Sequence, residues 1–208
     1  MTNKEFYNNY WNKRGESKGI RYRYQIILDW MKPESKVLDI GGGDGYLAEM
    51  LKDKKNCEVT VMDISEEALT MAFKRGVEVR VGNVEEKFPF EDNSFDSVVM
   101  SEVIEHVASS EFALKEAIRV SKNSIYVTVP NTGFYKYRLQ LLFGKFPKQW
   151  VFEPKEHLRF WTYKDFELMI KDLGLVVEKV KATAGRRYLR DLWKSLFAEQ
   201  VCYKLNKN

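Results

Sequence analysis

Three residues suited to proton transfer or metal binding lie close together in the chain: Glu102, Glu105 and His106. Their i, i+3, i+4 spacing would place the side chains on one face of a helical turn. Two carboxylates and an imidazole could bind a divalent metal ion, or His106 could act as a general base that a carboxylate orients. A structural role is also open, in which Glu105 and His106 fix a loop through hydrogen bonds while Glu102 faces a ligand. We take Glu102 and His106 as candidate catalytic residues, and we do not favour a metal.

The second of the two histidines, His157, lies in a long segment, residues 131–160, that mixes aromatic and basic side chains. This segment contains six basic and two acidic residues. It could line a pocket for an aromatic or anionic acceptor, with His157 and Arg159 among the lining residues. Alternatively, its aromatic side chains pack as a small satellite core while its lysines stay in water. His157 is the third candidate catalytic residue.

A glycine-rich turn follows an apolar strand that begins at Val37. Asp39 lies in this strand, and Gly41, Gly43 and Gly45 precede the next helix. Such a turn exposes backbone N–H groups at the carboxyl end of a parallel strand, where open α/β sheets bind ligands. The spacing does not fit the G-x-G-x-x-G pattern of dinucleotide-binding turns in either register. The turn suits close approach to an uncharged nucleoside, and the Asp39 carboxylate could meet an ammonium group directly or through water.

Three further predicted strands are followed by polar residues. The strand over residues 58–62 ends at Asp63, which lies 18 residues beyond Gly45, close to the spacing at which a carboxylate accepts hydrogen bonds from a ribose. The strands over 77–81 and 95–100 also run into polar residues. Because the carboxyl ends of parallel strands meet at one edge of a sheet, we expect a single ligand site there, with Asp63 as the ribose-binding candidate.

The motifs D-I-G-G-G-D-G, D-I-S, G-N-V-E with F-P-F-E-D-N-S-F-D, and S-E-V-I-E-H occur in this order in the chain. Together they resemble the class I S-adenosylmethionine-dependent methyltransferases, in the broad group that includes quinone-biosynthesis enzymes and methionine-biosynthesis W proteins. The resemblance is close over about residues 35 to 130. It implies that S-adenosylmethionine is the cofactor, that Asp39 and the three glycines of the turn hold its methionine moiety, and that Asp63 binds the ribose diol.

Other cofactor contacts implied by the resemblance follow the second, third and fourth strands. Ile64 would pack on the adenine ring, Asn83 and Val84 would contact its edge, and the region of Ser101 would lie under the sulfonium. The family often has aspartate where this chain has Asn83. Asparagine keeps an acceptor oxygen for the adenine amino group and adds a donor, so we expect the role to be kept. The resemblance also underlies the metal alternative, since a similar E-x-x-E-H run in quinone-biosynthesis O-methyltransferases could hold a metal that positions an acceptor hydroxyl.

Strand and helix patterns alternate along the chain, which indicates an α/β fold with a doubly wound, Rossmann-like, mostly parallel sheet. The resemblance adds the strand order 3-2-1-4-5-7-6 with an antiparallel last strand. The predicted helices cover 20–31, 46–54, 66–75, 110–121 and 166–173, and the last three predicted strands cover 125–129, 175–180 and 200–205. We expect one domain over residues 1–208, with lid helices in 1–34, the cofactor-binding core in 35–130, an acceptor-side insertion in 131–160, and a helix and strands in 161–208.

The two ends of the chain carry further candidates. In similar enzymes the N-terminal region forms a lid, which would use Tyr10 and Trp11 to exclude water and would place Arg14 near the methionine carboxylate. A simple packing helix is the alternative. The basic tail, residues 181–208, has five apolar residues at helical spacing. A membrane-surface or nucleic-acid role is open for it, although we favour packing between the last two strands.

The composition is that of a globular protein, with 208 residues, 44% hydrophobic and 31% charged content, and a net charge of +4. No apolar run approaches the roughly 18 residues that span a bilayer, so we expect no membrane span, while weak surface association stays open. The first residues lack the apolar core of a signal peptide, and the distant Cys57 and Cys202 form neither a disulfide framework nor a metal knuckle. We therefore expect a cytoplasmic monomer or homodimer.

The predicted function is transfer of a methyl group from S-adenosylmethionine to a small-molecule acceptor by in-line attack on the sulfonium methyl, with S-adenosylhomocysteine as product. Such a transfer depends chiefly on placement of the nucleophile. Two other functions are open: a cofactor-binding protein that supports or regulates another enzyme, and a nucleic-acid methyltransferase. The latter is weaker because no signature of base amination follows the fourth strand, and we expect no nucleic-acid partner.

Overall fold

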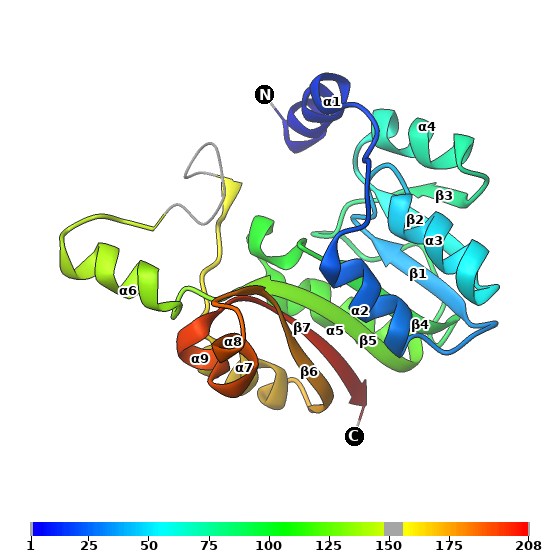
Figure 1. The fold of residues 1–208 in the computed structure, drawn as a ribbon. Helices are drawn as coiled ribbons and strands as arrows, with labels where there is room; N and C mark the ends of the chain where they lie inside the picture. Colours follow the sequence, from blue (N-terminus) through cyan, green and yellow to red (C-terminus); the bar gives the residue numbers. More distant parts are fainter. Residues whose placement is uncertain (1, 148–155, 208) are drawn as a thin grey trace.

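One mixed sheet forms the centre of the molecule (Figure 1). The computed structural model describes residues 2–147 and 156–207, and within them the sheet has seven strands in the order β3-β2-β1-β4-β5-β7-β6, with β7 antiparallel to β5 and β6. This confirms the doubly wound α/β fold and the strand order that the resemblance implied. The strands are β1 (Lys36–Ile40), β2 (Glu58–Asp63), β3 (Glu78–Val81), β4 (Phe95–Ser101), β5 (Ser121–Pro130), β6 (Leu175–Gly185) and β7 (Ala198–Lys207).

Helices cover both faces of the sheet, which is why its central strands are almost entirely apolar. On one face, α2, α3 and α4 pack on β1 and β2, and on the other α5 and α7 pack on β1, β4 and β5. Side chains alternate between the two faces of the sheet, so Val37 packs with α2, α3 and α4 whereas Leu38 packs with α5 and α7. The helices in the described residues are α1 (Asn3–Arg14), α2 (Tyr22–Trp30), α3 (Tyr46–Lys55), α4 (Glu66–Lys74), the 3₁₀ turn η1 (Ile104–His106), α5 (Ser110–Val120), α6 (Tyr135–Leu142), α7 (Tyr163–Asp172), α8 (Leu189–Leu192) and α9 (Lys194–Phe197).

Two helices begin directly after strands, at the carboxyl edge of the sheet. Gly45 has a φ of 71°, a left-handed conformation that turns the chain from β1 into α3. Ser65 begins α4, because its side chain accepts a hydrogen bond from the N–H of Ala68 at 3.2 Å. The loops after β1 and β2 therefore meet at one edge, next to the loop after β4.

The last three strands are longer than predicted. β5 begins at Ser121 rather than residue 125, and β6 continues to Gly185 rather than residue 180. The reason is tertiary: β7 lies between the two, and the pairing of Ser124 with Asn206 and of Gly185 with Ala198 extends both ladders. A local hydrophobic pattern does not reveal such pairing.

The basic tail differs from expectation, whereas the acceptor-side insertion over residues 131–160 stays a prediction, with residues 148–155 outside the described part of the chain. Part of the insertion folds as α6, which extends away from the sheet (Figure 1). The apolar residues of the tail form α8 and α9, but they do not all pack between the last strands: Leu192 is 84% exposed and Trp193 is 58% exposed. The expectation of core packing is therefore wrong for these two side chains. Among the described residues, none of the helices is long and apolar enough to cross a membrane.

Candidate functional site

A cavity of about 560 Å³ opens at the carboxyl ends of β1, β2 and β4. This volume lies within the range of small-molecule and cofactor sites. The structure brings most of the sequence-predicted residues to its wall, including both histidines. The predicted residues that line it are Gly41, Gly43, Asp63, Ile64, Asn83, Val84, Ser101, Glu102, His106 and His157, whereas Asp39 and Gly45 are not among the lining residues.

The glycines of the turn have different structural roles. Gly41 and Gly43 have φ values of 62° and 58°, and a Cβ on Gly43 would lie 2.3 Å from the ring of Trp11. The side chain of Trp11 packs directly on this part of the turn, and the left-handed φ values there favour glycine. Gly45 instead allows close packing on α4, because a Cβ there would lie 2.8 Å from that of Ala72.

Asp39 lies beneath the turn as a buried carboxyl group. It is 1% exposed, and its Oδ2 has no hydrogen-bond partner among the described residues. Burial, followed by the nearby Asp63 and Asp44, raises the pKa of Asp39 to about 8. A buried carboxyl group without a partner is costly. A cationic group bound at the turn would satisfy it.

Asp63 joins the two loops at the cavity floor. Its Oδ2 accepts a hydrogen bond from the N–H of Gly43 at 3.0 Å, and its Oδ1 accepts one from the N–H of Ser65 at 2.9 Å. Burial raises the pKa of this carboxyl group, and the backbone N–H groups of Ser65, Gly43 and Ile64 counter that effect. A carboxylate has about four acceptor positions, so two remain for hydroxyl groups in the cavity.

Asn83 shapes the loop after β3. Its Oδ1 accepts a hydrogen bond from the N–H of Glu85 at 3.0 Å, and its Nδ2 donates to Glu86 at 3.0 Å. The amide oxygen therefore keeps one lone pair for a ligand, while the donor is engaged within the loop. Glu85 in turn accepts a hydrogen bond from the N–H of Ala108 at 2.7 Å, which ties this loop to the one after β4.

Glu102 is directed toward β5 and β7. One carboxylate oxygen accepts from the hydroxyl of Thr128 at 2.8 Å, and the other accepts from the amide of Gln200. The expectation that Glu102 shares a helical face with Glu105 and His106 is wrong, because only η1 is helical and Glu102 precedes it with a φ of 60°.

A second group of titratable side chains, the Glu105–His106–His157 cluster, lines the same cavity. Each residue offers one ligand-type atom, and these atoms lie within 4.8 Å of one another. Glu105 is fully buried, and neither of its carboxyl oxygens has a hydrogen-bond partner among the described residues. Burial, followed by repulsion from Glu102, raises the pKa of Glu105 well above its usual range.

The two histidines of this cluster are held in a neutral state. Burial lowers the pKa of His106, and burial together with the neighbouring His106 lowers the pKa of His157 to about 4. Nδ1 of His106 lies 2.7 Å from the carbonyl oxygen of Glu156, so we assign the proton to Nδ1, where it donates to that carbonyl. Nε2 is then the basic nitrogen. The arrangement could accept a proton or hold a cation.

Backbone contacts bring His157 to His106. The N–H groups of Leu158 and Arg159 both donate to the carbonyl oxygen of Glu105, at 2.8 and 3.1 Å. The side chain of Arg159 is exposed and donates to the carbonyl of Ala108. It is not among the cavity-lining residues, so the expectation that it lines an acceptor pocket is wrong.

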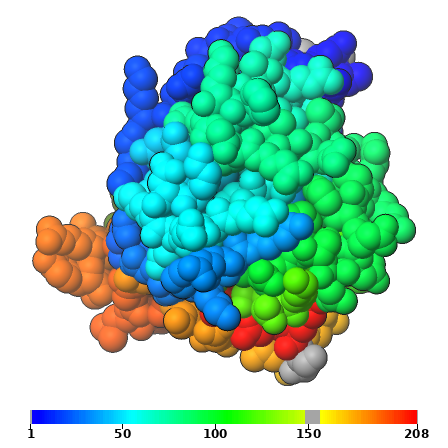
Figure 2. Space-filling view, turned by 90° about the vertical axis from the view of Figure 1, so that its right-hand side faces the viewer, coloured from blue at the N-terminus to red at the C-terminus, as the bar shows by residue number. Residues whose placement is uncertain are grey.

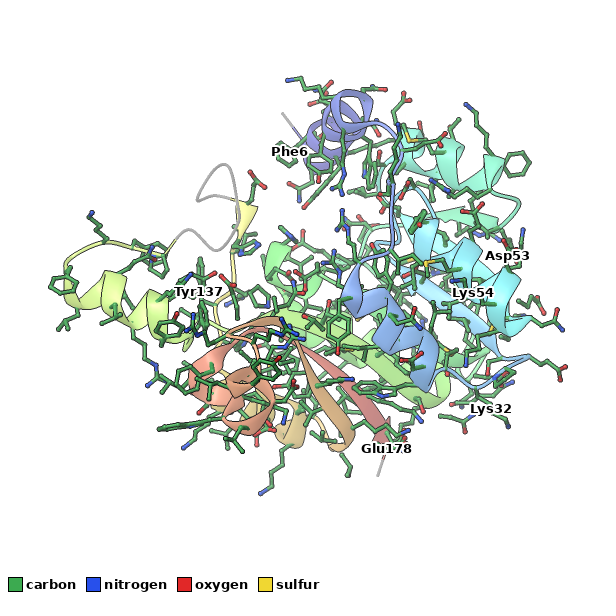
Figure 3. All side chains as sticks on the ribbon, viewed as in Figure 1. Phe6, Lys32, Asp53, Lys54, Tyr137 and Glu178 are labelled. Atoms are coloured by element: carbon green, nitrogen blue, oxygen red, sulfur yellow. The ribbon has the colours of Figure 1, made fainter. Side chains whose placement is uncertain are left out.

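The N-terminal segment covers one side of the cavity. Tyr10, Trp11 and Arg14 line it as predicted, and the guanidinium of Arg14 lies 5.3 and 5.2 Å from the two ring centroids. Phe6 on α1 lines it too (Figure 3). The sequence analysis did not identify four further lining residues, Arg21, Arg23, Tyr24 and Gln200. The first three lie near the start of α2, where the alternating Arg-Tyr-Arg-Tyr run was the available signal. Gln200 lies on β7, where the signal was a glutamine within a predicted strand.

Asp44 is another lining residue that was not singled out. Its carboxylate lies 3.0 Å from the guanidinium of Arg75 and accepts the N–H of Ser17 at 2.6 Å. Because Arg75 ends α4, this ion pair fixes the glycine turn against that helix. Both side chains are largely buried, so the contact helps hold the turn in one conformation.

Comparison with known proteins gives the same fold and a family. The family model for methionine biosynthesis protein MetW matches residues 21–205. The chain is 30% identical over 192 residues to the ubiquinone/menaquinone biosynthesis C-methyltransferase UbiE of Rhizobium meliloti, covering 78% of this chain and 73% of that protein.

Solved structures show the same architecture. A SAM-dependent methyltransferase from Thermotoga maritima, described as a possible histamine N-methyltransferase, matches with a TM-score of 0.67, 24% identity and 90% coverage of both chains. Magnesium protoporphyrin IX methyltransferase from Synechocystis, with bound SAH, matches with a TM-score of 0.72, 14% identity, and coverage of 99% of this chain and 98% of that one. At these identities the two structures support the fold alone.

Proposed function

Since this chain belongs to the MetW family and has the class I fold of S-adenosylmethionine-dependent methyltransferases, we propose that it transfers the methyl group of S-adenosylmethionine to a small-molecule acceptor. The observation that carries this proposal is the buried, unpartnered Asp39 carboxyl group beneath the glycine turn. The cofactor has an ammonium group, a ribose diol and an adenine ring; the cavity wall offers groups suited to the diol and the adenine, and the Asp39 carboxyl group lies buried beneath the turn, behind the wall, where it would favour a nearby cation. No comparison names the acceptor of this chain.

The residues present fit this cofactor. Asp39 would favour its ammonium group, and the two remaining acceptor positions of Asp63 would take the ribose diol. Ile64 and Val84 provide apolar wall for adenine, next to the free lone pair of Asn83. When bound, S-adenosylmethionine supplies a methyl group already activated by the sulfonium.

The acceptor would be placed and deprotonated by the residues of the opposite wall. His106, neutral with Nε2 basic, can accept a proton from an acceptor hydroxyl or amine. Glu102 is held by Thr128 and Gln200, so it forms a fixed negative wall beside the reacting groups. His157 packs on His106, with ring centroids 4.8 Å apart, and limits how that ring can turn. Aromatic residues of α1 would exclude water.

The test has two steps on the full chain. Calorimetric titration with S-adenosylhomocysteine measures cofactor binding, and incubation of the protein with a cell extract and methyl-labelled cofactor, followed by mass spectrometry, identifies any labelled acceptor. Binding together with a labelled metabolite supports the proposal. Absence of binding refutes the whole assignment.

A binding role without turnover is the second candidate. The description of the matching family names a biosynthetic process rather than a methyltransferase activity, which favours keeping it. Cofactor binding without label transfer to any acceptor would support this role. A nucleic-acid substrate is disfavoured because the carboxylates of Glu102 and Glu199 line the cavity and would repel phosphate groups.

A further inference from the structure

A surface outside the cavity exposes many large apolar side chains. The chain from residue 131 to 147 contains no aspartate or glutamate, and within α6 only Tyr137 is buried. Leu142 and Phe143 are each 75% exposed, which is unusual for such residues in a cluster. We call this region, together with the exposed part of α8 and α9, the α6–α9 surface. Its apolar members are Leu139, Leu141, Leu142, Phe143, Phe146, Tyr188, Leu189, Leu192 and Trp193.

The two parts of the α6–α9 surface are in contact with each other. The rings of Tyr135 and Phe197 lie 5.7 Å apart, and the guanidinium of Arg138 donates to the carbonyl of Ser195 at 3.3 Å. The segment of α8 and α9 projects from the body of the protein (Figure 2), and α6 extends away from the sheet beside it (Figure 1). The exposed apolar side chains of α6 and of the α8–α9 segment therefore lie at the same end of the molecule, on two segments that touch where α6 begins and α9 ends.

Basic residues surround the apolar side chains. A second cavity, of about 390 Å³, lies between α6 and the start of α8, and Lys136, Arg186 and Arg187 line it. Among the described residues, Lys136 and Arg186 have no side-chain hydrogen bond or ion pair, and Arg187 contacts only the ring of Tyr188. The one acidic lining residue, Glu199, already accepts a hydrogen bond from Tyr137. The positive charge of this cavity is thus largely uncompensated.

The combination favours a lipid surface over other occupants. Apolar side chains flanked by lysine and arginine are typical of segments that lie in a membrane interface, where the apolar groups enter the acyl boundary and the bases contact anionic headgroups. A nucleic acid could bind the lysine and arginine side chains through its phosphates, but it would leave Leu142 and Leu192 in water. An acidic protein could neutralise the positive charge, but it would not cover so wide an apolar area.

We propose that the α6–α9 surface docks onto a lipid bilayer that carries anionic headgroups. Leu142, Phe143 and Leu192 enter the acyl boundary, and Lys136, Arg186 and Arg187 contact headgroup phosphates. Because Glu199 lines both cavities, docking places the acceptor side of the first cavity near the membrane. This proposal does not rest on methyl transfer, since it concerns a surface whose binding can be measured without cofactor.

The test is co-sedimentation of the full chain with vesicles. Vesicles of phosphatidylcholine alone are compared with vesicles containing about 30% phosphatidylglycerol, at about 0.1 M salt. We expect partition onto the anionic vesicles only, weakening as salt is raised to about 0.5 M. Each lysine or arginine near an anionic surface contributes about a fivefold change in the partition coefficient. The double variant Arg186→Glu, Arg187→Glu should therefore bind the anionic vesicles at least about 25-fold more weakly.

A second variant tests the apolar contribution, with matched controls. Phe143→Ser with Leu192→Ser should lower partition by about tenfold per side chain, and both side chains are exposed, so the fold should be kept. Phe73→Ser removes a 69% exposed aromatic on α4, and Lys32→Glu with Lys54→Glu reverses two charges on the far side of the molecule from Tyr137 and α6 (Figure 3). Both controls should bind as the wild type does.

Three outcomes overturn the proposal. The chain stays in the supernatant with anionic vesicles, or the controls lose binding as much as the test variants, or the protein forms a dimer that Phe143→Ser with Leu192→Ser abolishes and that does not bind vesicles. The last outcome would assign the surface to a second copy of the chain. Circular dichroism of each variant distinguishes loss of binding from loss of fold.

Discussion

Replacing Asp63 with alanine would perturb the proposed cofactor site at the point where the loops after β1 and β2 meet. The carboxylate accepts the N–H groups of Gly43 and Ser65 at 3.0 and 2.9 Å, so it fixes the glycine turn and leaves two acceptor positions for a diol. Loss of charge-assisted hydrogen bonds to the diol is worth about 1.5–3 kcal/mol, which corresponds to about a 10- to 150-fold loss of affinity. Calorimetric titration with S-adenosylhomocysteine measures this change.

The variant should remain folded. Two backbone N–H groups lose their acceptor, which costs about 1–3 kcal/mol each when they stay buried. Removal of a buried carboxyl group whose pKa is raised by burial offsets part of that cost. We expect a lower midpoint of thermal unfolding, by about 2–4 °C for each kcal/mol lost.

A matched control separates the site from the general effect of losing a carboxylate. Asp53 lies on α3 and is exposed (Figure 3), so Asp53→Ala should change neither the affinity nor the unfolding midpoint. Asp63→Asn, which keeps an acceptor oxygen without the charge, should bind with intermediate affinity. A folded Asp63→Ala variant with wild-type affinity would refute the assignment of Asp63 to the ribose.

Further expectations concern the turn and the buried titratable groups. Gly43→Val should abolish cofactor binding, because its Cβ would lie 2.3 Å from the ring of Trp11 and its φ is 58°, so the turn and the Trp11 side chain, which both line the cavity, would have to shift; normal binding by a folded variant would make the turn structural only. The pKa of Asp39 is about 8, so the free protein holds it mostly protonated at about pH 7, and an ammonium group would favour ionisation; affinity should rise between about pH 6 and 8 with release of protons, and Asp39→Asn should remove both effects in calorimetry. His106→Ala should slow methyl transfer about 10²- to 10⁴-fold with little change in cofactor affinity, and turnover should persist in chelator, since a loss there would assign the cluster to a metal. Burial lowers the pKa of His157 to about 4, below its unfolded value of about 6.5, so between about pH 6.5 and 4 the folded state binds fewer protons than the unfolded state. The free energy of unfolding should therefore fall by about 2–3 kcal/mol as the pH drops through this range. His157→Gln should flatten this pH dependence, which denaturant titration measures.

The sequence by itself predicted the alternating α/β sheet and the sheet edge at which the glycine turn and Asp63 lie, while the strand order came from the family resemblance. The glycine turn could be recognised because each left-handed φ there favours a residue without a Cβ. Asp63 could be placed because a carboxylate that ends a parallel strand must reach the same edge as the neighbouring strand ends. These features depend on the local residue pattern and on backbone geometry, so they can be predicted from the sequence.

Only the tertiary structure decided the arrangement of Glu102, His106 and His157, the residues proposed for the acceptor side. His106 and His157 are brought together by two backbone hydrogen bonds to the carbonyl of Glu105, and backbone groups carry no sequence signal. Glu102 is directed away from the expected helical face by Thr128 and Gln200, which come from two other strands. Which side chains meet there depends on how three distant segments pack, because burial and hydrogen bonding across them, rather than the spacing along one segment, set the geometry.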